Sequence, residues 1–247
     1  MKIIGLIPSR YASTRFHAKP LVDIKGKSMI QRVYEQVSKA QSISKVVVAT
    51  DHRDIFDHVN AFGGLVCMTK DSHVSGTDRC YEALTLQPEK FDYVINIQGD
   101  EPFIQPSQID LLASKLTGMT EIATLVKALA TKEELFDPNL VKAVVSKGDE
   151  ALYFSRSPIP HIRNTPEEQW LSKHKFYKHI GMYAYRSDIL EQLTRLPVSS
   201  LEKAESLEQL RWLENGYRIS IAETLTETFG IDTPDDLERA IQHLTTR

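Results

Sequence analysis

The sequence predicts an α/β protein built on a doubly wound, mostly parallel sheet. Three segments, 2–8, 46–51 and 93–100, each contain an apolar run rich in β-branched residues that leads directly into polar residues. Such runs are typical of strands buried inside a parallel sheet. Strand and helix patterns alternate through the first half of the chain. In sheets of this kind, ligands bind beyond the carboxyl ends of the strands.

The helices of the first half are predicted from apolar spacing and from their end residues. One helix has an apolar face made of Met29, Ile30, Val33, Tyr34 and Val37. The next is predicted to begin after Asp51, acting as its N-cap, and to end at Gly63. Residues 65–68 then resume an extended strand.

The second half is less regular. Strands are predicted at 124–130, 141–145 and 152–154, and the proline- and charge-rich segment 158–175 indicates an inserted arm. We therefore predict a single domain over residues 1–247, with the arm inserted at approximately 130–185.

Residues 199–216 are predicted to form one helix. Ser199 and Glu202 have capping-box spacing, apolar residues follow at helical intervals, and Gly216 ends the pattern. Because side chains three or four residues apart are neighbours on a helix, one face is expected to carry Glu205, Glu208, Gln209 and Trp212.

Composition excludes several classes of function. The net charge of −3 over 247 residues argues against a general nucleic-acid binder. Cys67 and Cys80 form neither a disulfide framework nor a metal-ligand pattern, which favours a reducing, cytoplasmic compartment. The first apolar run is too short to span a bilayer and lacks a signal-peptide cleavage region, so no membrane insertion is expected.

A short basic loop follows the first predicted strand. It holds Arg10, Arg15 and Lys19 together with Ser9, Ser13 and Thr14. Close positive charges repel one another unless an anion meets them, and a polyphosphate would also accept hydrogen bonds from the hydroxyls. The loop is therefore either a nucleotide triphosphate site or a solvated basic loop.

Two aspartates are candidate ligands of magnesium. Asp100 follows the third apolar run, and Asp232 precedes a helix whose start is specified by Thr233 and Pro234. Mg²⁺ takes hard oxygen ligands and commonly uses one or two protein carboxylates. Aspartate is also common in turns and caps, so a structural role stays open at each position.

Two further segments are candidate binding sites. Ser75, Gly76 and Arg79 lie at a helix entry, where a glycine and free N–H groups can approach a base, a ribose or an anion. Arg156, His179, Tyr183, Glu208 and Gln209 supply the mixed donors and acceptors that an acidic sugar requires. The alternative interpretations are an ordinary helix entry for the first segment and ordinary core residues for the second.

The motifs together resemble one known family over nearly the whole chain. They occupy residues 7–15, 49–51, 75–79, 96–102, 151–156, 178–181, 207–211 and 231–234. In this order and spacing they resemble the 3-deoxy-manno-octulosonate cytidylyltransferase (CMP-Kdo synthetase) family. The resemblance implies a nucleotide-diphospho-sugar transferase-like fold with a dimerisation arm.

The resemblance also implies the activity and the role of each site residue. CTP and 3-deoxy-D-manno-octulosonate (Kdo) would give CMP-Kdo and pyrophosphate for lipopolysaccharide biosynthesis, with Mg²⁺ as cofactor, in a cytoplasmic homodimer. The triphosphate would be held by Arg10, Arg15 and Lys19, and the cytidine by Pro8, Ser9, Ser75, Gly76, Arg79 and Gln98. Asp100 and Asp232 would hold the metal. The Kdo pocket would consist of Arg156, His179, Tyr183, Glu208 and Gln209.

The chain departs from the family pattern in the basic loop. His17 and Ala18 stand where the family usually has proline and glycine, and Ser9 stands where alanine is common. Loss of the glycine disfavours a positive φ, so a differently shaped loop is expected. Two alternatives remain: a cytidylyltransferase for a related acid sugar such as 8-amino-Kdo or sialic acid, or a non-catalytic nucleotide-binding regulator.

Overall fold

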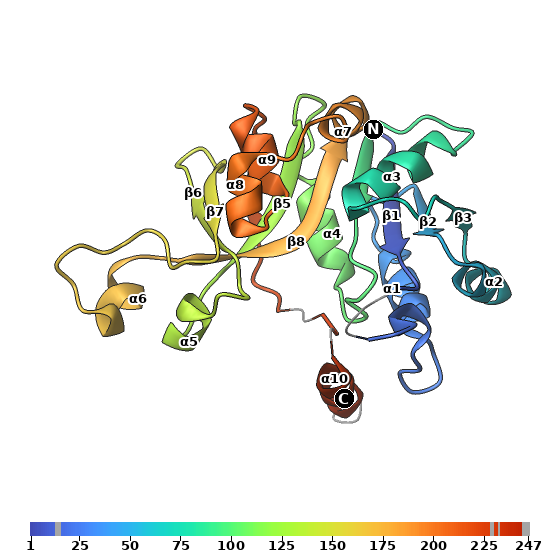
Figure 1. The fold of residues 1–247 in the computed structure, drawn as a ribbon, viewed down its shortest axis with the longest axis horizontal. Coiled ribbons are helices and arrows are strands. Elements are labelled where there is room, and N and C mark those ends of the chain that lie inside the picture. Colours follow the sequence, from blue (N-terminus) through green and yellow to red (C-terminus); the bar gives the residue numbers. More distant parts are fainter. Residues whose placement is uncertain (13–15, 228–229, 232, 244–247) are drawn as a thin grey trace. The chain divides into compact units, whose positions relative to one another are not determined.

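The computed structural model describes residues 1–12, 16–227, 230–231 and 233–243 (Figure 1). The chain forms two compact units. The first contains Met1–Asp110 and Glu227–Arg247, and the second contains Leu111–Thr226.

The first unit contains a parallel sheet in the order β3-β2-β1-β4. Its strands are β1 (Ile3–Ser9), β2 (Lys45–Thr50), β3 (Val66–Met68) and β4 (Tyr93–Asn96). All four were predicted from the sequence and are confirmed. Because β1 pairs with β2 on one side and with β4 on the other, the strand order reverses between β1 and β4. Such a switch point is where doubly wound sheets bind ligands.

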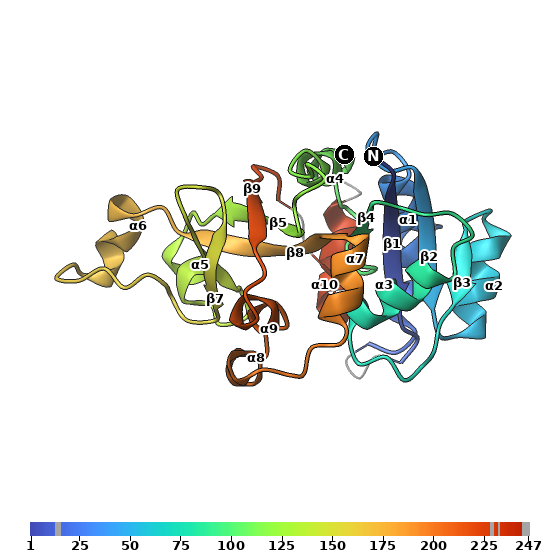
Figure 2. The same cartoon turned by 90° about the horizontal axis from the view of Figure 1, so that it is seen from above.

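Helices of the first unit lie on opposite faces of this sheet (Figure 2). A Cβ placed on Gly5 of β1 would meet Val37 at the end of α1, whereas one on Gly76 of α3 would meet Pro8. Gly5 and Pro8 are an odd number of residues apart along β1 and so face opposite sides. The helices are α1 (Met29–Val37), α2 (Arg53–Ala61), α3 (Gly76–Thr85) and α10 (Pro234–His243), with the 3₁₀ turn η1 (Lys19–Leu21); α4 (Pro106–Ala113) leads into the second unit.

The start of α2 differs from the prediction. Its N-cap is His52, whose Nδ1 accepts a hydrogen bond from the N–H of Asp54 at 3.2 Å. The prediction that Asp51 caps this helix is wrong because the Asp51 carboxylate pairs with Arg79 instead, at 2.7 Å. The end at Gly63 is confirmed, with a φ of 80° that suits glycine.

The second unit is built on β5 (Ile122–Ala128), β6 (Lys142–Val145), β7 (Ala151–Ser155), β8 (Tyr177–Arg186) and β9 (Ile219–Glu223). Strand β5 pairs antiparallel with β8 and parallel with β9, and β6 pairs antiparallel with β7 and β8. Its helices are α5 (Lys132–Phe136), α6 (Trp170–Lys173), α7 (Ser187–Leu193), α8 (Ser200–Glu205) and α9 (Gln209–Glu214), with η2 (Glu167–Gln169). The predicted α/β class, a mostly parallel sheet with flanking helices, is confirmed.

The single helix predicted over 199–216 is wrong, because the chain breaks into α8 and α9. The capping box of Ser199 and Glu202 is present, but Ser206 adopts a left-handed conformation with a φ of 53°. Left-handed backbone ends an α-helix, so the helical spacing does not continue past Glu205. Glu205 is consequently free to turn away from Glu208 and Gln209.

The predicted arm at 158–175 contributes to a small apolar core of its own. Trp170 and Phe176 are buried there against Leu129 and Leu135, and the indole Nε1 donates to the carbonyl of Thr165 at 3.0 Å. This burial explains why a proline- and charge-rich segment is ordered. The single-domain boundary at 1–247 and a dimerisation role of residues 130–185 stay predictions.

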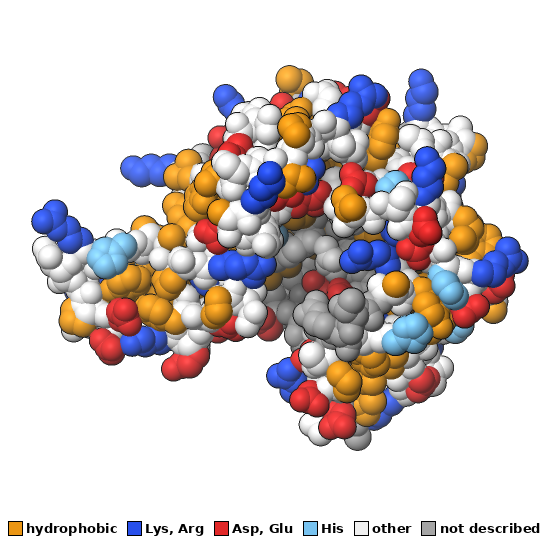
Figure 3. All heavy atoms as spheres, in the orientation of Figure 1, with side chains coloured by type: hydrophobic (Ala, Val, Ile, Leu, Met, Phe, Trp, Pro, Cys, Tyr) orange, Lys and Arg blue, Asp and Glu red, His pale blue; other side chains and the backbone are white. Residues whose placement is uncertain are grey.

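Charges of both signs are interspersed on the face shown in Figure 3, as the net charge of −3 leads one to expect. Cys67 and Cys80 are free thiols. In the part of the chain that the structure describes, no helix combines the length and apolar character needed to span a bilayer.

Candidate active site

Buried polar atoms mark the switch point of the first unit. Ser9 at the end of β1 is 3% exposed and Asn96 at the end of β4 is 5% exposed. Among the described residues, neither Ser9 Oγ nor Asn96 Oδ1 has a hydrogen-bond partner. Buried polar atoms are normally satisfied, so these two call for a ligand or an ordered water. Sequence reasoning missed Asn96 as a site residue, although its amide is a polar group inside the third apolar run.

The start of α3 forms one side of this site. Ser75 is the N-cap, and its Oγ accepts a hydrogen bond from the N–H of Asp78 at 3.1 Å. A Cβ on Gly76 would lie 3.5 Å from Pro8 Cγ and 3.6 Å from Asn96 Nδ2. The glycine therefore leaves space between the proline ring and the amide, at the positive end of the helix dipole.

Arg79 holds the beginning of the basic loop in place. Its guanidinium is 1% exposed and donates to Asp51 Oδ2 at 2.7 Å and to Thr69 Oγ1 at 2.6 Å. Asp51 Oδ1 in turn accepts from the N–H of Tyr11 at 3.5 Å. The Tyr11 ring stacks on His52 with centroids 3.7 Å apart. This network ties the end of β2 and the start of α2 to the loop after β1.

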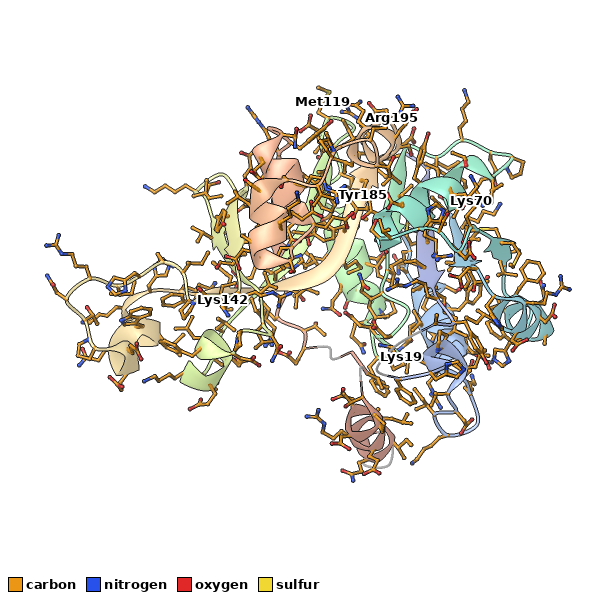
Figure 4. All side chains as sticks on the ribbon, viewed as in Figure 1. Lys19, Lys70, Met119, Lys142, Tyr185 and Arg195 are labelled. Carbon is orange, nitrogen blue, oxygen red and sulfur yellow. The ribbon has the colours of Figure 1, made fainter. Side chains whose placement is uncertain are left out.

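Lys19 and Asp100 form an ion pair at the carboxyl end of the sheet. Lys19 Nζ lies 2.7 Å from Asp100 Oδ2, and the two side chains are 13% and 30% exposed (Figure 4). Arg10 is exposed. The predicted residues Ser13, Thr14 and Arg15 lie outside the described residues.

Ala18, just before Lys19, adopts a left-handed conformation with a φ of 51° and caps η1. The carbonyl of Ala18 accepts a hydrogen bond from the N–H of Leu21 at 2.9 Å. Position 18 therefore has a positive φ although alanine disfavours it, and a differently shaped loop stays a prediction. Alanine keeps this conformation at a cost in backbone energy.

Asp100 also contacts the segment that leads into α10. The carbonyl of Asp100 accepts a hydrogen bond from the N–H of Ile231 at 2.9 Å, and a Cβ on Gly230 would lie 3.8 Å from the same oxygen. Asp232 itself lies outside the described residues. No cluster of three or more histidine, cysteine or acidic side chains able to hold a metal occurs among the residues the structure describes. The predicted cap is confirmed, because Thr233 Oγ1 accepts from the N–H of Asp236 at 3.2 Å.

In the second unit, His179 and Tyr183 point from one face of β8. Their ring centroids lie 5.1 Å apart. Burial lowers the pKa of His179 to about 3, so the imidazole is neutral at physiological pH. Its Nε2 lies 3.0 Å from the hydroxyl of Thr124 on β5.

Tyr183 is an aromatic side chain with an unsatisfied hydroxyl. It is 7% exposed, and its OH has no hydrogen-bond partner among the described residues. Burial, and then the nearby Tyr185 and Glu208, raise the pKa of Tyr183 well above its ordinary value, so the OH stays protonated. Trp212 of α9 packs edge-on at 5.0 Å between centroids. Tyr185, next on the same face, is labelled on β8 in Figure 4.

Arg156 is held by neutral groups. Its Nε donates to the carbonyl of Glu205 at 2.8 Å, and one terminal nitrogen donates to the carbonyl of Pro138 at 3.1 Å. The Glu205 carboxylate accepts from the backbone N–H of Arg156 at 3.0 Å and from the Ser155 hydroxyl at 2.6 Å. The guanidinium is thus fixed in place with no carboxylate of the described chain paired to it, which leaves its charge for an anion.

Comparison with known proteins decides the family. Residues 4–221 match the cytidylyltransferase (CTP_transf_3) family. A 3-deoxy-manno-octulosonate cytidylyltransferase from Parabacteroides distasonis is 56% identical, over all of both chains. The same enzyme from Bacteroides thetaiotaomicron is 55% identical, again over all of both chains. The chain belongs to the 3-deoxy-manno-octulosonate cytidylyltransferase family.

Solved structures agree with this membership. The structure of a CMP:2-keto-3-deoxy-manno-octonic acid synthetase complexed with CTP has a TM-score of 0.93 and 42% identity, covering 100% of this chain and 99% of that one. A 4-diphosphocytidyl-2C-methyl-D-erythritol synthase from Anaerococcus prevotii shares only the fold, with a TM-score of 0.65 at 12% identity.

For this cytidylyltransferase, the structure gathers the predicted residues into two groups. The first unit holds Pro8, Ser9, Arg10, Lys19, Ser75, Gly76, Arg79, Gln98 and Asp100, and the second holds Arg156, His179, Tyr183, Glu208 and Gln209. The sequence did not predict the burial of Lys142, which is fully buried at the start of β6 (Figure 4). Its Nζ donates to the carbonyls of Asp137 at 2.8 Å and Leu140 at 2.6 Å. Burial, reinforced by the charge of Arg156 and opposed by Asp137, lowers the pKa of Lys142.

Proposed function

We infer that this chain transfers CMP from CTP to Kdo, giving CMP-Kdo and pyrophosphate. The full-length similarity to 3-deoxy-manno-octulosonate cytidylyltransferases carries this conclusion. The side chains of each unit have the chemistry that one of the two substrates requires.

The first unit is proposed to bind CTP. Its unsatisfied atoms, Ser9 Oγ and Asn96 Oδ1, and the space at Gly76 support a base and ribose site at the β1–β4 switch point. The cytidine is assigned to Pro8, Ser9, Ser75, Gly76, Arg79 and Gln98, and the triphosphate to Arg10, Arg15 and Lys19. Lys19 is the best supported of the cations, because it already lies against an acidic group at the carboxyl end of the sheet.

Asp100 and Asp232 are proposed to hold Mg²⁺. A partly exposed carboxylate at Asp100 is a ligand of the hard oxygen type that this cation prefers. The hydrogen bond from Ile231, the residue before Asp232, to the carbonyl of Asp100 supports the pairing of these two positions. When bound, Mg²⁺ supplies positive charge that polarises the α-phosphate.

The second unit is proposed to bind Kdo. The guanidinium of Arg156, fixed by backbone carbonyls, is suited to the sugar carboxylate. His179, Tyr183, Glu208 and Gln209 are assigned to the sugar hydroxyls. This division gives the carboxylate of the sugar a cationic partner and leaves its hydroxyls to side chains that donate and accept hydrogen bonds.

The reaction is an in-line displacement. The anomeric hydroxyl of Kdo attacks the α-phosphorus of CTP and gives up its proton to solvent, and the bond from that phosphorus to the bridging oxygen of pyrophosphate breaks. Negative charge grows on the departing oxygen and is met by Lys19 and Arg15. No covalent enzyme intermediate forms in this scheme.

Assembly and location are further parts of the proposal. A homodimer formed through the arm at 130–185 accounts for an insertion with its own apolar core. A cytoplasmic location accords with two free cysteines. The product CMP-Kdo would serve lipopolysaccharide biosynthesis.

Pyrophosphate release with CTP, Mg²⁺ and a panel of acid sugars tests the assignment. Release with Kdo, and much slower release with 8-amino-Kdo and sialic acid, is the expected result. Faster pyrophosphate release with another sugar would identify that sugar as the substrate instead of Kdo. No release with any sugar would favour the nucleotide-binding regulator.

The role of Lys19 is tested by Lys19→Ala. Loss of a preorganised positive charge at the leaving group is expected to lower kcat by about a hundredfold or more. Lys27→Ala is the matched control, because Lys27 pairs with Glu35 at 2.6 Å on the surface. Equal turnover of Lys19→Ala and the wild type would show that Lys19 has no role in the mechanism.

A further inference from the structure

Thr124 lies where strand β8 bulges against β5. The register passes from Thr124 opposite Tyr183 to Leu125 opposite Ile180, so Gly181 and Met182 of β8 are passed over. A bulge of this kind disrupts the ladder and leaves backbone groups to be satisfied by other means. Strands β5 and β8 run side by side in both ribbon views (Figures 1 and 2).

The hydroxyl of Thr124 lies within hydrogen-bond distance of two backbone carbonyls at the bulge. Its side chain is fully buried, and Oγ1 lies 2.8 Å from the carbonyl oxygen of Met182 and 3.2 Å from that of Ile180. The same Oγ1 lies 3.0 Å from Nε2 of His179. One hydroxyl therefore contacts three polar atoms of β8.

The hydrogen count of this contact fixes where the imidazole proton is. A threonine hydroxyl has one hydrogen and two lone pairs, and a carbonyl oxygen only accepts. The single hydrogen goes to a carbonyl, of which Met182 is the nearer. Toward His179, the Thr124 oxygen must then accept, so Nε2 carries a hydrogen.

The ring is neutral, because burial lowers the pKa of His179 to about 3. A neutral imidazole with its hydrogen on Nε2 has a lone pair on Nδ1. The hydrogen bond that the described residues make to this ring is the one to Nε2. Nδ1 is therefore left as an acceptor.

We propose that Thr124 is a positioning residue that fixes His179 as the Nε2–H tautomer, so that Nδ1 accepts a hydrogen bond from a sugar hydroxyl. The ligand class rests on the proposed function. The arrangement excludes the sugar carboxylate from this position, since a carboxylate has only lone pairs to offer to Nδ1. That group is left to Arg156.

Tyr183 completes the recognition of a hydroxyl. Its buried OH has no partner in the described chain, and its ring lies 5.1 Å from that of His179 on the same face of β8. A hydroxyl can donate to Nδ1 and accept from Tyr183 together, whereas an ammonium group has no lone pair with which to accept. A ligand group that contacts both side chains in this way is therefore a hydroxyl and not an ammonium.

The tautomer is measured by ¹⁵N NMR of the full chain labelled at histidine. In the wild type and in Thr124→Ser, between pH 6 and 8, His179 is expected to show a protonated Nε2 and an unprotonated Nδ1. In Thr124→Val, which lacks the acceptor, this single tautomer is expected to be lost. A protonated Nδ1 in the wild type, or an unchanged tautomer in Thr124→Val, would overturn the proposal.

Steady-state kinetics on the same three proteins measures the consequence for binding. The KM for Kdo is expected to rise about tenfold in Thr124→Val, as for one lost hydrogen bond, with the KM for CTP unchanged. Thr124→Ser is expected to restore the wild-type value, and equal impairment of both variants would contradict a role of the hydroxyl.

The two proposals fail separately. If the wild type does not accept Kdo, the proposed function is wrong, while the NMR spectrum still decides the tautomer. If Thr124→Val does not fold, Thr124→Ala, which also lacks the hydroxyl, takes its place in both experiments.

Discussion

Ala18→Gly tests whether the basic loop is held under backbone strain. The φ of 51° at Ala18 costs an L-residue roughly 1–2 kcal/mol, and glycine removes this cost. Glycine also gives the unfolded chain more freedom, which lowers stability by about 0.4–1 kcal/mol. The difference between the central values of these two ranges predicts a net gain of about 0.8 kcal/mol. For a chain of 247 residues, this gain corresponds to a rise in Tm of about 1–4 °C.

The assay is thermal unfolding followed by circular dichroism, with Ala61→Gly as the matched control. Ala61 lies in α2 and has no positive φ, so the same substitution there is expected to lower stability by about 0.5–1 kcal/mol. Opposite signs for the two variants would confirm the strain at Ala18. A fall in Tm for Ala18→Gly equal to that for Ala61→Gly would refute it.

Two further predictions concern buried charge. Asp51→Ala is expected to lower the free energy of unfolding in urea by about 3–5 kcal/mol, because it leaves the buried Arg79 guanidinium unpaired. Asp57→Ala, which breaks the exposed Arg53–Asp57 pair, is expected to cost about 0.5 kcal/mol, and similar losses for the two variants would contradict this reasoning. The pKa of His179 is about 3 in the fold against 6.5 ordinarily, so between these values only the unfolded chain binds the proton. Stability contributed by neutral His179 is thus full above pH 6.5 and is lost as the pH falls from 6.5 toward 3, by about 1.4 kcal/mol per pH unit. Urea unfolding of the wild type and His179→Gln from pH 7.5 to 5 should therefore diverge, and parallel profiles would show that His179 is not buried as described.

Local sequence patterns predicted the fold well where a pattern is compatible with only one type of secondary structure. Buried β-branched runs became β1, β2 and β4, and the capping signals at Ser199 and Thr233 began helices. The break at Ser206 could not be predicted in this way. Serine carries no strong preference for the left-handed conformation, and the break depends on the surroundings of α8 and α9.

Site residues could be chosen by chemistry, but their partners could not. The sequence pointed to Arg79 and Arg156, yet only the folded chain shows that Asp51 holds the first and that Glu205 and Pro138 position the second. These partners are distant in sequence and follow no fixed spacing. Thr124 was missed for the same reason, since within its strand it looks like any β-branched residue.

The left-handed Ser206 separates the backbone segments that support the two sides of the proposed sugar site. Glu205, before the break, holds Ser155 and the backbone of Arg156, whereas Gln209, after it, is buried at the start of another helix. In an unbroken helix these residues, four apart, would move together. If these residues bind the sugar as proposed, substitutions in α9 change which polyol is accepted without moving the Arg156 guanidinium, and a new sugar preference then requires only a few substitutions there.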